Sequence, residues 1–284
     1  MPIFRAGKII AGSIGNFMTR LIYPPCCPIC RVDVNDYNGI CARCWKEAFF
    51  FPQGGCCFCG VPIIGEAGYK SYVREENADD DMMFYSGCIC EDCNVLRPLW
   101  NAGRSVSLYA GATRALVLQM KHAGREDIAP MLGTWMVRSA EDLLLMSDWL
   151  IPVPLDNLRM IKRRYNQSAL VAKAVARITG CKVAYDALRR DIAYGYSRSR
   201  TKEERFKSAK GVFTMNYKWR SRLEGKSVML IDDVLTTGAT MSACTEILLR
   251  YNVSQVFVLV VCRTVLHGDI AEEGKKIDMQ TEYS

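Results

Sequence analysis

The stretch Ser227 to Thr240, SVMLIDDVLTTGAT, carries side chains that could bind a phosphorylated sugar. The apolar run Val228 to Ile231 predicts a strand buried on both faces, and two carboxylates, Asp232 and Asp233, follow it. Small and hydroxyl residues then lead into a helical pattern: Thr236, Thr237, Gly238, Ala239 and Thr240. Backbone N–H groups at a helix start favour a phosphate, whereas paired carboxylates prefer hydroxyls or a hydrated divalent cation. A sugar phosphate offers both; a capped helix after an Asp-rich turn, with no ligand, is the alternative.

This stretch closely resembles the phosphoribosyl-pyrophosphate (PRPP) loop of type I phosphoribosyltransferases, in which a hydrophobic strand precedes two acidic residues and a TTGAT-like turn. The resemblance implies that Asp232 and Asp233 hold the ribose hydroxyls, directly or through hydrated magnesium. It also implies that the turn from Thr236 to Thr240 anchors the 5′-phosphate. In a transferase these residues would serve catalysis through positioning and charge stabilisation.

A second set of candidate residues consists of cysteines, because eleven of the 14 cysteines precede residue 94. They include four CxxC pairs, Cys27/Cys30, Cys41/Cys44, Cys56/Cys59 and Cys90/Cys93. Two such turns complete a tetrahedral sulfur site, so four turns predict two structural zinc ions; sequential pairing is the simplest, and interleaved pairing stays open. A disulfide framework is the competing interpretation, and redox chemistry is less favoured because it needs fewer copies. Cys26, Cys57 and Cys88 are interpreted as spare or buried thiols.

The spacing of hydrophobic residues after Cys93 predicts the strands and helices that position the carboxylates and the threonine turn. A strand is expected near Arg104 to Tyr109, then two helices with Lys121 and His122 between them, in a turn where a solvated role is as probable as a ligand role. A second strand over Trp149 to Val153 precedes a helix from about Ser168 to Ile178, and SQVFVLVVCR predicts another buried parallel strand. The pattern predicts an α/β domain with a parallel sheet flanked by helices.

The order of several motifs extends the resemblance to most of the chain. YPPCCPIC, QMKHAGR, IPVPL, RRYNQS and IDDVLTTGAT follow one another as in the ComF family of competence-associated proteins. The resemblance implies a double zinc ribbon joined to a type I phosphoribosyltransferase-like domain, and a protein that binds PRPP and assists DNA uptake. The expected divisions are an amphipathic helix (1–22), the double zinc ribbon (23–100), the phosphoribosyltransferase-like domain (101–267) and a disordered tail (268–284).

Basic residues gather in two segments, Arg159 to Arg164 and Arg198 to Lys210, in a chain with a net charge of +7. Arg163 and Arg164 are expected to bind the pyrophosphate, as are the basic residues of a mobile loop: Arg198, Arg200, Lys202 and Arg205. A charged, solvated helix over Lys202 to Lys210 is the equal alternative for the loop. Single-stranded DNA could also track across both segments, with Tyr165, Tyr194 and Tyr196 stacking on bases, although ordinary surface packing is the alternative.

The composition of the 284-residue chain is that of an ordinary globular protein. Polar residues interrupt its N-terminal apolar stretch, and no apolar run is long enough for a membrane span, so a cytoplasmic protein is expected. Three functions stay open: a transferase releasing pyrophosphate from PRPP, a PRPP or nucleotide sensor that handles DNA, and a purely structural partner. No segment identifies an acceptor base.

Overall fold

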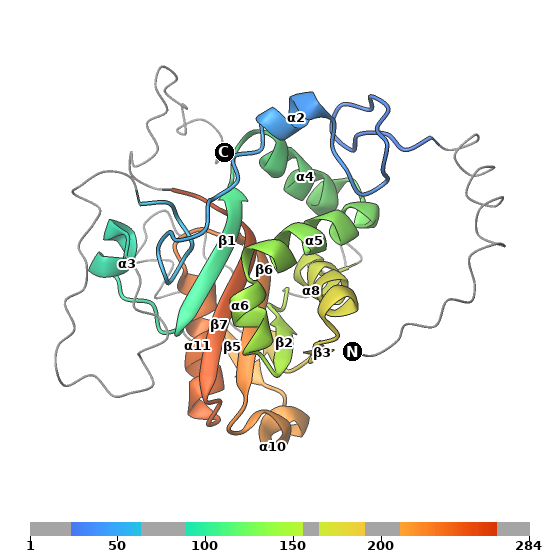
Figure 1. Ribbon diagram of the computed structural model, residues 1–284. Coiled ribbons are helices and arrows are strands. Elements are labelled where there is room, and N and C mark those ends of the chain that lie inside the picture. The colour runs from blue at the N-terminus through green and yellow to red at the C-terminus, as the bar shows by residue number, and fades with distance from the viewer. Residues whose placement is uncertain (1–23, 64–88, 156–164, 191–210, 266–284) are drawn as a thin grey trace, which may run out of the picture.

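The computed structural model describes residues 24–63, 89–155, 165–190 and 211–265 (Figure 1). Several predicted features lie outside these ranges: the helix over 1–22, the tail over 268–284, Cys88, Arg163, Arg164, Tyr194, Tyr196 and the basic segment Arg198 to Lys210. In the part of the chain that is described, no helix is both long and apolar enough to cross a membrane.

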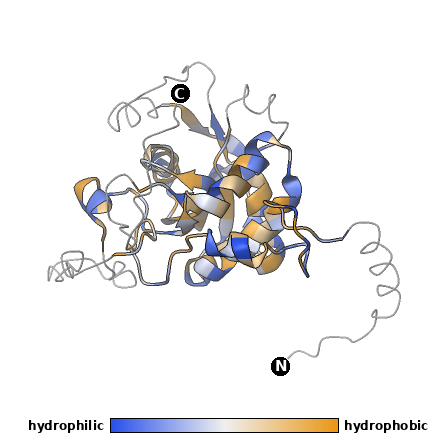
Figure 2. Cartoon of the chain, turned by 90° about the horizontal axis from the view of Figure 1, so that it is seen from above, coloured by the Kyte–Doolittle hydropathy of each residue, from blue (hydrophilic) through white to orange (hydrophobic). Residues whose placement is uncertain are grey.

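The centre of the molecule is a five-stranded parallel sheet in the order β1, β7, β6, β2, β3. The strands are β1 (Ala102–Leu108), β2 (Trp149–Pro152), β3 (Lys182–Val183), β6 (Ser227–Leu235) and β7 (Gln255–Arg263). β6 and β7 are buried on both faces, as their nearly unbroken apolar runs require, and Figure 2 shows the central strands as largely hydrophobic. The parallel strands need crossover connections, which the helices supply.

Helices cover both faces of the sheet, so the fold has three layers (Figure 1). On one face lie α4 (Gly111–His122), α5 (Ala129–Ser139), α6 (Glu141–Leu145) and α8 (Gln167–Thr179), with a 3-10 turn, η3, at Glu126–Ile128. On the other face lie α11 (Ala239–Arg250), α10 (Arg220–Leu223), η4 (Tyr217–Trp219) and the antiparallel pair β4 (Leu188–Arg190) and β5 (Phe213–Met215). Alternating residues of β6 feed the two cores, since Leu230 joins one and Ile231 the other.

The cysteine-rich segment, with α2 (Ala42–Lys46) and α3 (Glu91–Val95), covers the outer edge of β1. Phe51 N–H donates to Val106 O at 2.9 Å, and Leu108 N–H donates to Phe49 O at 2.9 Å. Gly103 N–H donates to Cys57 O at 2.8 Å. These bonds satisfy backbone groups that a sheet edge would otherwise expose. The cysteine segment is therefore built onto the sheet, and the predicted fold class, an α/β sheet preceded by a cysteine-rich module, is confirmed.

Two local expectations are wrong. The strand predicted over Val228–Ile231 continues to Leu235, because β7 pairs with it as far as Leu235 opposite Arg263, so both carboxylates lie within the strand rather than after it. Lys121 and His122 form the last turn of α4 instead of a linker between helices.

Candidate functional site

The two carboxylates lie in β6 beyond the last residue that β2 covers. Pro152 pairs with Ile231, and the ladder between β2 and β6 then ends, while β6 continues through Asp232 and Asp233. This is the carboxyl edge of the parallel sheet, where open α/β folds place their ligands. Burial and the neighbouring Asp233 raise the pKa of Asp232 to about 7. The strand therefore delivers two carboxyl groups to one place at a cost in electrostatic repulsion.

Lys121, for which the sequence left a solvated role and a ligand role open, offsets part of this repulsion. Lys121 Nζ, at the end of α4, lies 3.0 Å from Asp233 Oδ2, and both side chains are largely buried. Burial would lower the pKa of Lys121, but the charge of Asp233 outweighs it and the pKa is raised. The lysine is therefore a charged partner of the pair. The only sequence signal for it is its place in QMKHAGR, because local spacing does not reveal that α4 ends beside β6.

The start of α8 positions a hydroxyl against the other carboxylate. Ser168 Oγ donates to Asp232 Oδ1 at 2.7 Å, and the backbone N–H of Asp233 donates to the same oxygen at 2.9 Å. Asn166 caps the helix by accepting from Ser168 N–H at 3.0 Å and donates to Val153 O at 2.9 Å. The segment YNQS thus has a structural reason for its residue types: it ties α8 to β2 and directs a hydroxyl at Asp232.

Tyr165, predicted to stack on bases or to pack on the surface, is anchored to the protein through its hydroxyl. Its OH donates to Met120 O at 2.5 Å. This bond joins the beginning of α8 to the end of α4, next to Lys121. Tyr165 therefore contributes to holding the carboxylate site together. Arg163 and Arg164, predicted for the pyrophosphate, lie outside the described residues, so their roles stay predictions.

The threonine turn leads directly from β6 into α11 through Gly238. Gly238 has φ +81, in the left-handed region that favours glycine, and it precedes the first residue of the helix. Ala239 N–H donates weakly to Thr237 Oγ1 at 3.4 Å, while Thr236, Thr237 and Thr240 are all half-buried. The turn thus presents hydroxyls and the first N–H groups of a 12-residue helix close to the carboxylates.

The CxxC turns gather into two groups of four sulfurs. Group 1 contains Cys27, Cys30, Cys41 and Cys44, and group 2 contains Cys56, Cys59, Cys90 and Cys93. Within each group all Sγ atoms lie within 4.8 Å of one another, and Cys59 and Cys90 are 3.6 Å apart. A tetrahedral site with metal–sulfur bonds of roughly 2.3 Å has sulfurs about 3.8 Å apart. The donor set and spacing therefore fit one metal ion per group, in the sequential pairing.

The other cysteines that the structure describes belong to neither group. Cys26 Sγ lies 3.7 Å from Asp33 Oδ1, and Cys57, beside group 2, is half-buried. Among the described residues all cysteines are free thiols, and the Cys30 to Cys41 separation of 3.4 Å is far longer than a disulfide. The backbone N–H of Val32 lowers the pKa of Cys30 to about 6, which favours the thiolate that metal binding needs.

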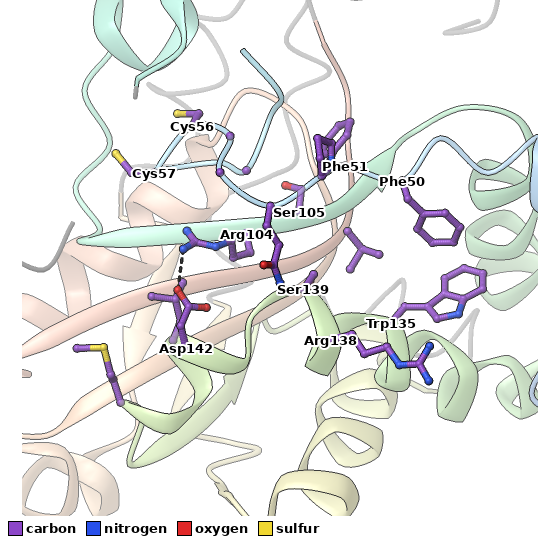
Figure 3. A pocket seen from close by; sticks show the side chains of 18 of the residues that line it. Phe50, Phe51, Cys56, Cys57, Arg104, Ser105, Trp135, Arg138, Ser139 and Asp142 are labelled. Carbon is purple, nitrogen blue, oxygen red and sulfur yellow. Dashed lines mark hydrogen bonds and ion pairs between the residues drawn. The ribbon is translucent and has the colours of Figure 1, made fainter. Parts of the chain in front are cut away.

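A cavity lies apart from the carboxylates, between the cysteine module and helices α5 and α6 (Figure 3). Its volume is about 610 Å³. The aromatic rings of Phe50 and Trp135 form one wall, and the ion pair between Arg104 and Asp142, at 2.7 Å, crosses another part. Of the predicted site residues, Cys56 alone lines it in the described part of the chain.

Comparisons with known proteins agree with this arrangement. The phosphoribosyl transferase domain family matches residues 166–282, a span that includes α8, β6, the threonine turn and β7. The DNA utilization protein YhgH of Escherichia coli K12 is 26% identical over 251 residues, covering 86% of this chain and all of that protein. Competence protein F of Haemophilus influenzae is 23% identical over 232 residues, covering 80% of this chain and 91% of that protein.

The structure of the allosteric regulatory enzyme of purine biosynthesis is 18% identical and covers 57% of this chain and 29% of that chain, with a TM-score of 0.31. The matched domain, two relatives similar over nearly their full length and two four-cysteine groups occur together in this chain. This combination is the one that the order of sequence motifs indicated. The chain is therefore similar over most of its length to the DNA utilization and competence proteins, and it joins a cysteine-rich module to a region that matches the phosphoribosyl transferase domain family.

Proposed function

We propose that this protein binds PRPP, or a related phosphoribosyl nucleotide, with magnesium, and that it acts on DNA during its uptake. PRPP binding is supported chiefly by one observation: Asp232 and Asp233 lie near the end of β6, and the threonine turn that follows leads directly into α11. The matched domain supports the same ligand class. The names of the relatives, DNA utilization protein and competence protein, support the second part.

The residues of the site have complementary tasks in such a complex. Thr236, Thr237 and Thr240 would donate to the 5′-phosphate together with the N–H groups at the start of α11. Asp232 and Asp233 would accept hydrogen bonds from the ribose hydroxyls, with Ser168 fixing the orientation of Asp232. Magnesium, when bound, supplies positive charge that offsets the pyrophosphate. Lys121 would hold the Asp233 side chain in place through their ion pair.

We also propose that zinc is the metal of groups 1 and 2. Four thiolates in a closed tetrahedral set are typical of structural zinc, and the sulfur separations fit it. The sites would hold the cysteine module together and leave no metal coordination position for the sugar phosphate, since each group offers a complete ligand set of its own.

Calorimetric titration with PRPP tests the ligand. With magnesium present we expect saturable binding of one PRPP per chain, weaker binding of ribose 5-phosphate, which lacks the pyrophosphate, and little binding of ribose, which lacks the phosphate as well. Pyrophosphate release in a subsequent screen of acceptor bases would show that the site also performs transfer. Equal heats for ribose and PRPP, or none for PRPP and nucleotides, would contradict the proposal.

Single-stranded DNA binding is expected to be independent of sequence and to weaken steeply with salt, because cationic contacts to phosphates release counterions. We expect the replacement of Arg163, Arg164, Arg198 and Arg200 by Ala to make the negative slope of log affinity against log salt shallower by up to about 3. Each lost phosphate contact removes roughly 0.7 from the magnitude of this slope. Fluorescence anisotropy with labelled DNA at several salt concentrations measures this slope.

The matched control removes the same charge from the end of the sheet where the strands begin. Its four substitutions to Ala fall on exposed residues in α8, in α10 and before β6: Arg177, Arg220, Arg222 and Lys226. We expect the control to bind like the parent. Equal loss in both variants would show a general charge effect, and unchanged binding in the first variant would remove the DNA contact from these segments.

A further inference from the structure

Group 2 lies directly behind the threonine turn. A cavity of about 20 Å³ separates them, lined by Asp92, Arg97 and Trp100 on one side and by Thr236, Thr237 and Gly238 on the other. That volume holds about one water molecule, so the two walls are nearly in contact. Group 2 also shares a core with α11, because Cys56, Cys59 and Cys90 belong to the same cluster of buried residues as Met241 and Cys244. Group 1 belongs to a separate cluster, with Ala48 and Ala112.

Trp100 makes the mechanical link between group 2 and the turn. Its indole is 4% exposed, and Nε1 donates to Phe58 O at 2.7 Å, between two cysteines of the module. A Cβ atom added at Gly238 would lie 3.1 Å from Trp100 Cη2, so the ring edge packs against the back of the glycine that starts α11. A displacement of the Phe58 segment therefore moves the ring that supports Gly238.

Arg263 makes an electrostatic link at the same place. It is the last residue of β7, pairs in register with Leu235 and is 5% exposed. Its Nη2 lies 3.5 Å from Asp92 Oδ2, while Nε has no hydrogen-bond partner among the described residues. Asp92 lies in α3 between the group 2 cysteines Cys90 and Cys93, and Cys93 lines the same small cavity as Arg263. The guanidinium thus stands between the sulfurs of group 2 and the end of the strand that leads into the turn.

We propose that Trp100 and Arg263 are positioning residues of the phosphate site, through which metal binding at group 2 sets the shape of the threonine turn. The identity of the ligand in this inference rests on the proposed function. The contacts that join group 2 to the turn do not depend on it. A zinc ion with four thiolates carries a net charge of −2, which the cation of Arg263 offsets. Because ligand and metal then bias one local structure, each strengthens the binding of the other.

The first test needs no ligand and compares Trp100→Phe with Trp219→Phe. Trp219 is a matched control, since it is 7% exposed, its Nε1 donates to Asp186 Oδ1 at 2.9 Å, and it does not line the cavity behind the turn. Hydrogen exchange of peptides covering Thr236 to Ser242 should be about tenfold faster in Trp100→Phe and unchanged in Trp219→Phe. Equal exchange in both variants overturns the inference, whatever the protein binds.

The second test measures coupling with PRPP as the probe. Trp100→Phe should weaken PRPP binding about tenfold, and Trp219→Phe less than twofold. PRPP should also slow chelator extraction of one of the two zinc equivalents, the one in group 2, and leave the other unchanged. If the parent binds PRPP but extraction of both equivalents is unaffected and Trp100→Phe binds normally, the coupling is wrong and the proposed function stands. If the parent binds no PRPP, the proposed function fails and the exchange experiment still decides the link.

Discussion

Replacing Asp232 and Asp233 by Asn is expected to weaken PRPP binding at least about 100-fold, on the order of 3 kcal/mol, while the protein stays folded. Amides cannot accept the charge-assisted hydrogen bonds of the ribose hydroxyls as carboxylates do, nor hold a divalent cation. Folding should survive because the loss of the repulsion between the two carboxylates offsets part of the cost of leaving Lys121 without its partner. Calorimetry with PRPP and magnesium measures the affinity, and circular dichroism checks the fold.

Lys121→Met supplies the comparison for this double variant. Methionine keeps a side chain of similar bulk at this position of α4 but leaves Asp233 without the ammonium group that lies 3.0 Å away. We expect lower thermal stability and a smaller loss of PRPP affinity than in the double variant, because magnesium can replace part of the missing charge. PRPP binding by the Asn double variant at parental affinity would show that β6 does not hold the ribose.

Purified protein is expected to contain two zinc ions per chain, and their removal is expected to lower Tm by more than about 10 °C. Closed four-thiolate sites contribute on the order of 10 kcal/mol to folding in small zinc domains, which is comparable with the stability of a whole domain. Group 2 is buried at all four cysteines, whereas group 1 has two that are half-buried, so extraction should occur in two phases with group 1 first. Elemental analysis and a chelator time course measure both results.

Neighbouring cysteines offer the control for the metal sites. Cys56→Ser removes a ligand of group 2 and should leave one tightly held zinc, whereas Cys57→Ser alters the adjacent thiol, which belongs to neither group, and should leave two. Loss of zinc in both variants would mean that Cys57 is also a ligand. Intramolecular disulfides in native mass spectra of fresh protein would overturn the metal sites altogether.

Local patterns were sufficient for the parts of the fold that depend on them. The apolar run of β7 and the spacing of α8 predict these elements within a residue or two, because burial on both faces or on one stripe leaves a periodic trace. The CxxC spacing likewise predicts the four-cysteine groups, since both ligands of a turn come from neighbouring positions in the sequence. The threonine turn is the clearest case, with strand, glycine and helix in one short stretch.

The contacts that complete the site are absent from those patterns because they join distant segments. Lys121 meets Asp233 across 112 positions, a pairing set by the docking of α4 against the sheet. The role of Ser168 was missed for the same reason, although its motif was noted. Trp100 and Arg263 showed no pattern at all, since each acts through a neighbour that tertiary packing brings to it.

The position of β1 has a consequence for how the chain is synthesised. Within the sheet β1 pairs with β7 alone, and Ala102 lies opposite Phe257, near the end of the described chain. The cysteine module emerges from the ribosome first, but the strand on which it docks gains its sheet partner only when the last strand has been made. Because such long-range pairing forms late, the cysteine module has no completed sheet to dock on while the chain is being made, and metal binding by the two groups is an interaction that it can form locally. We therefore expect metal supplied during translation to raise the yield of native protein more than metal added afterwards.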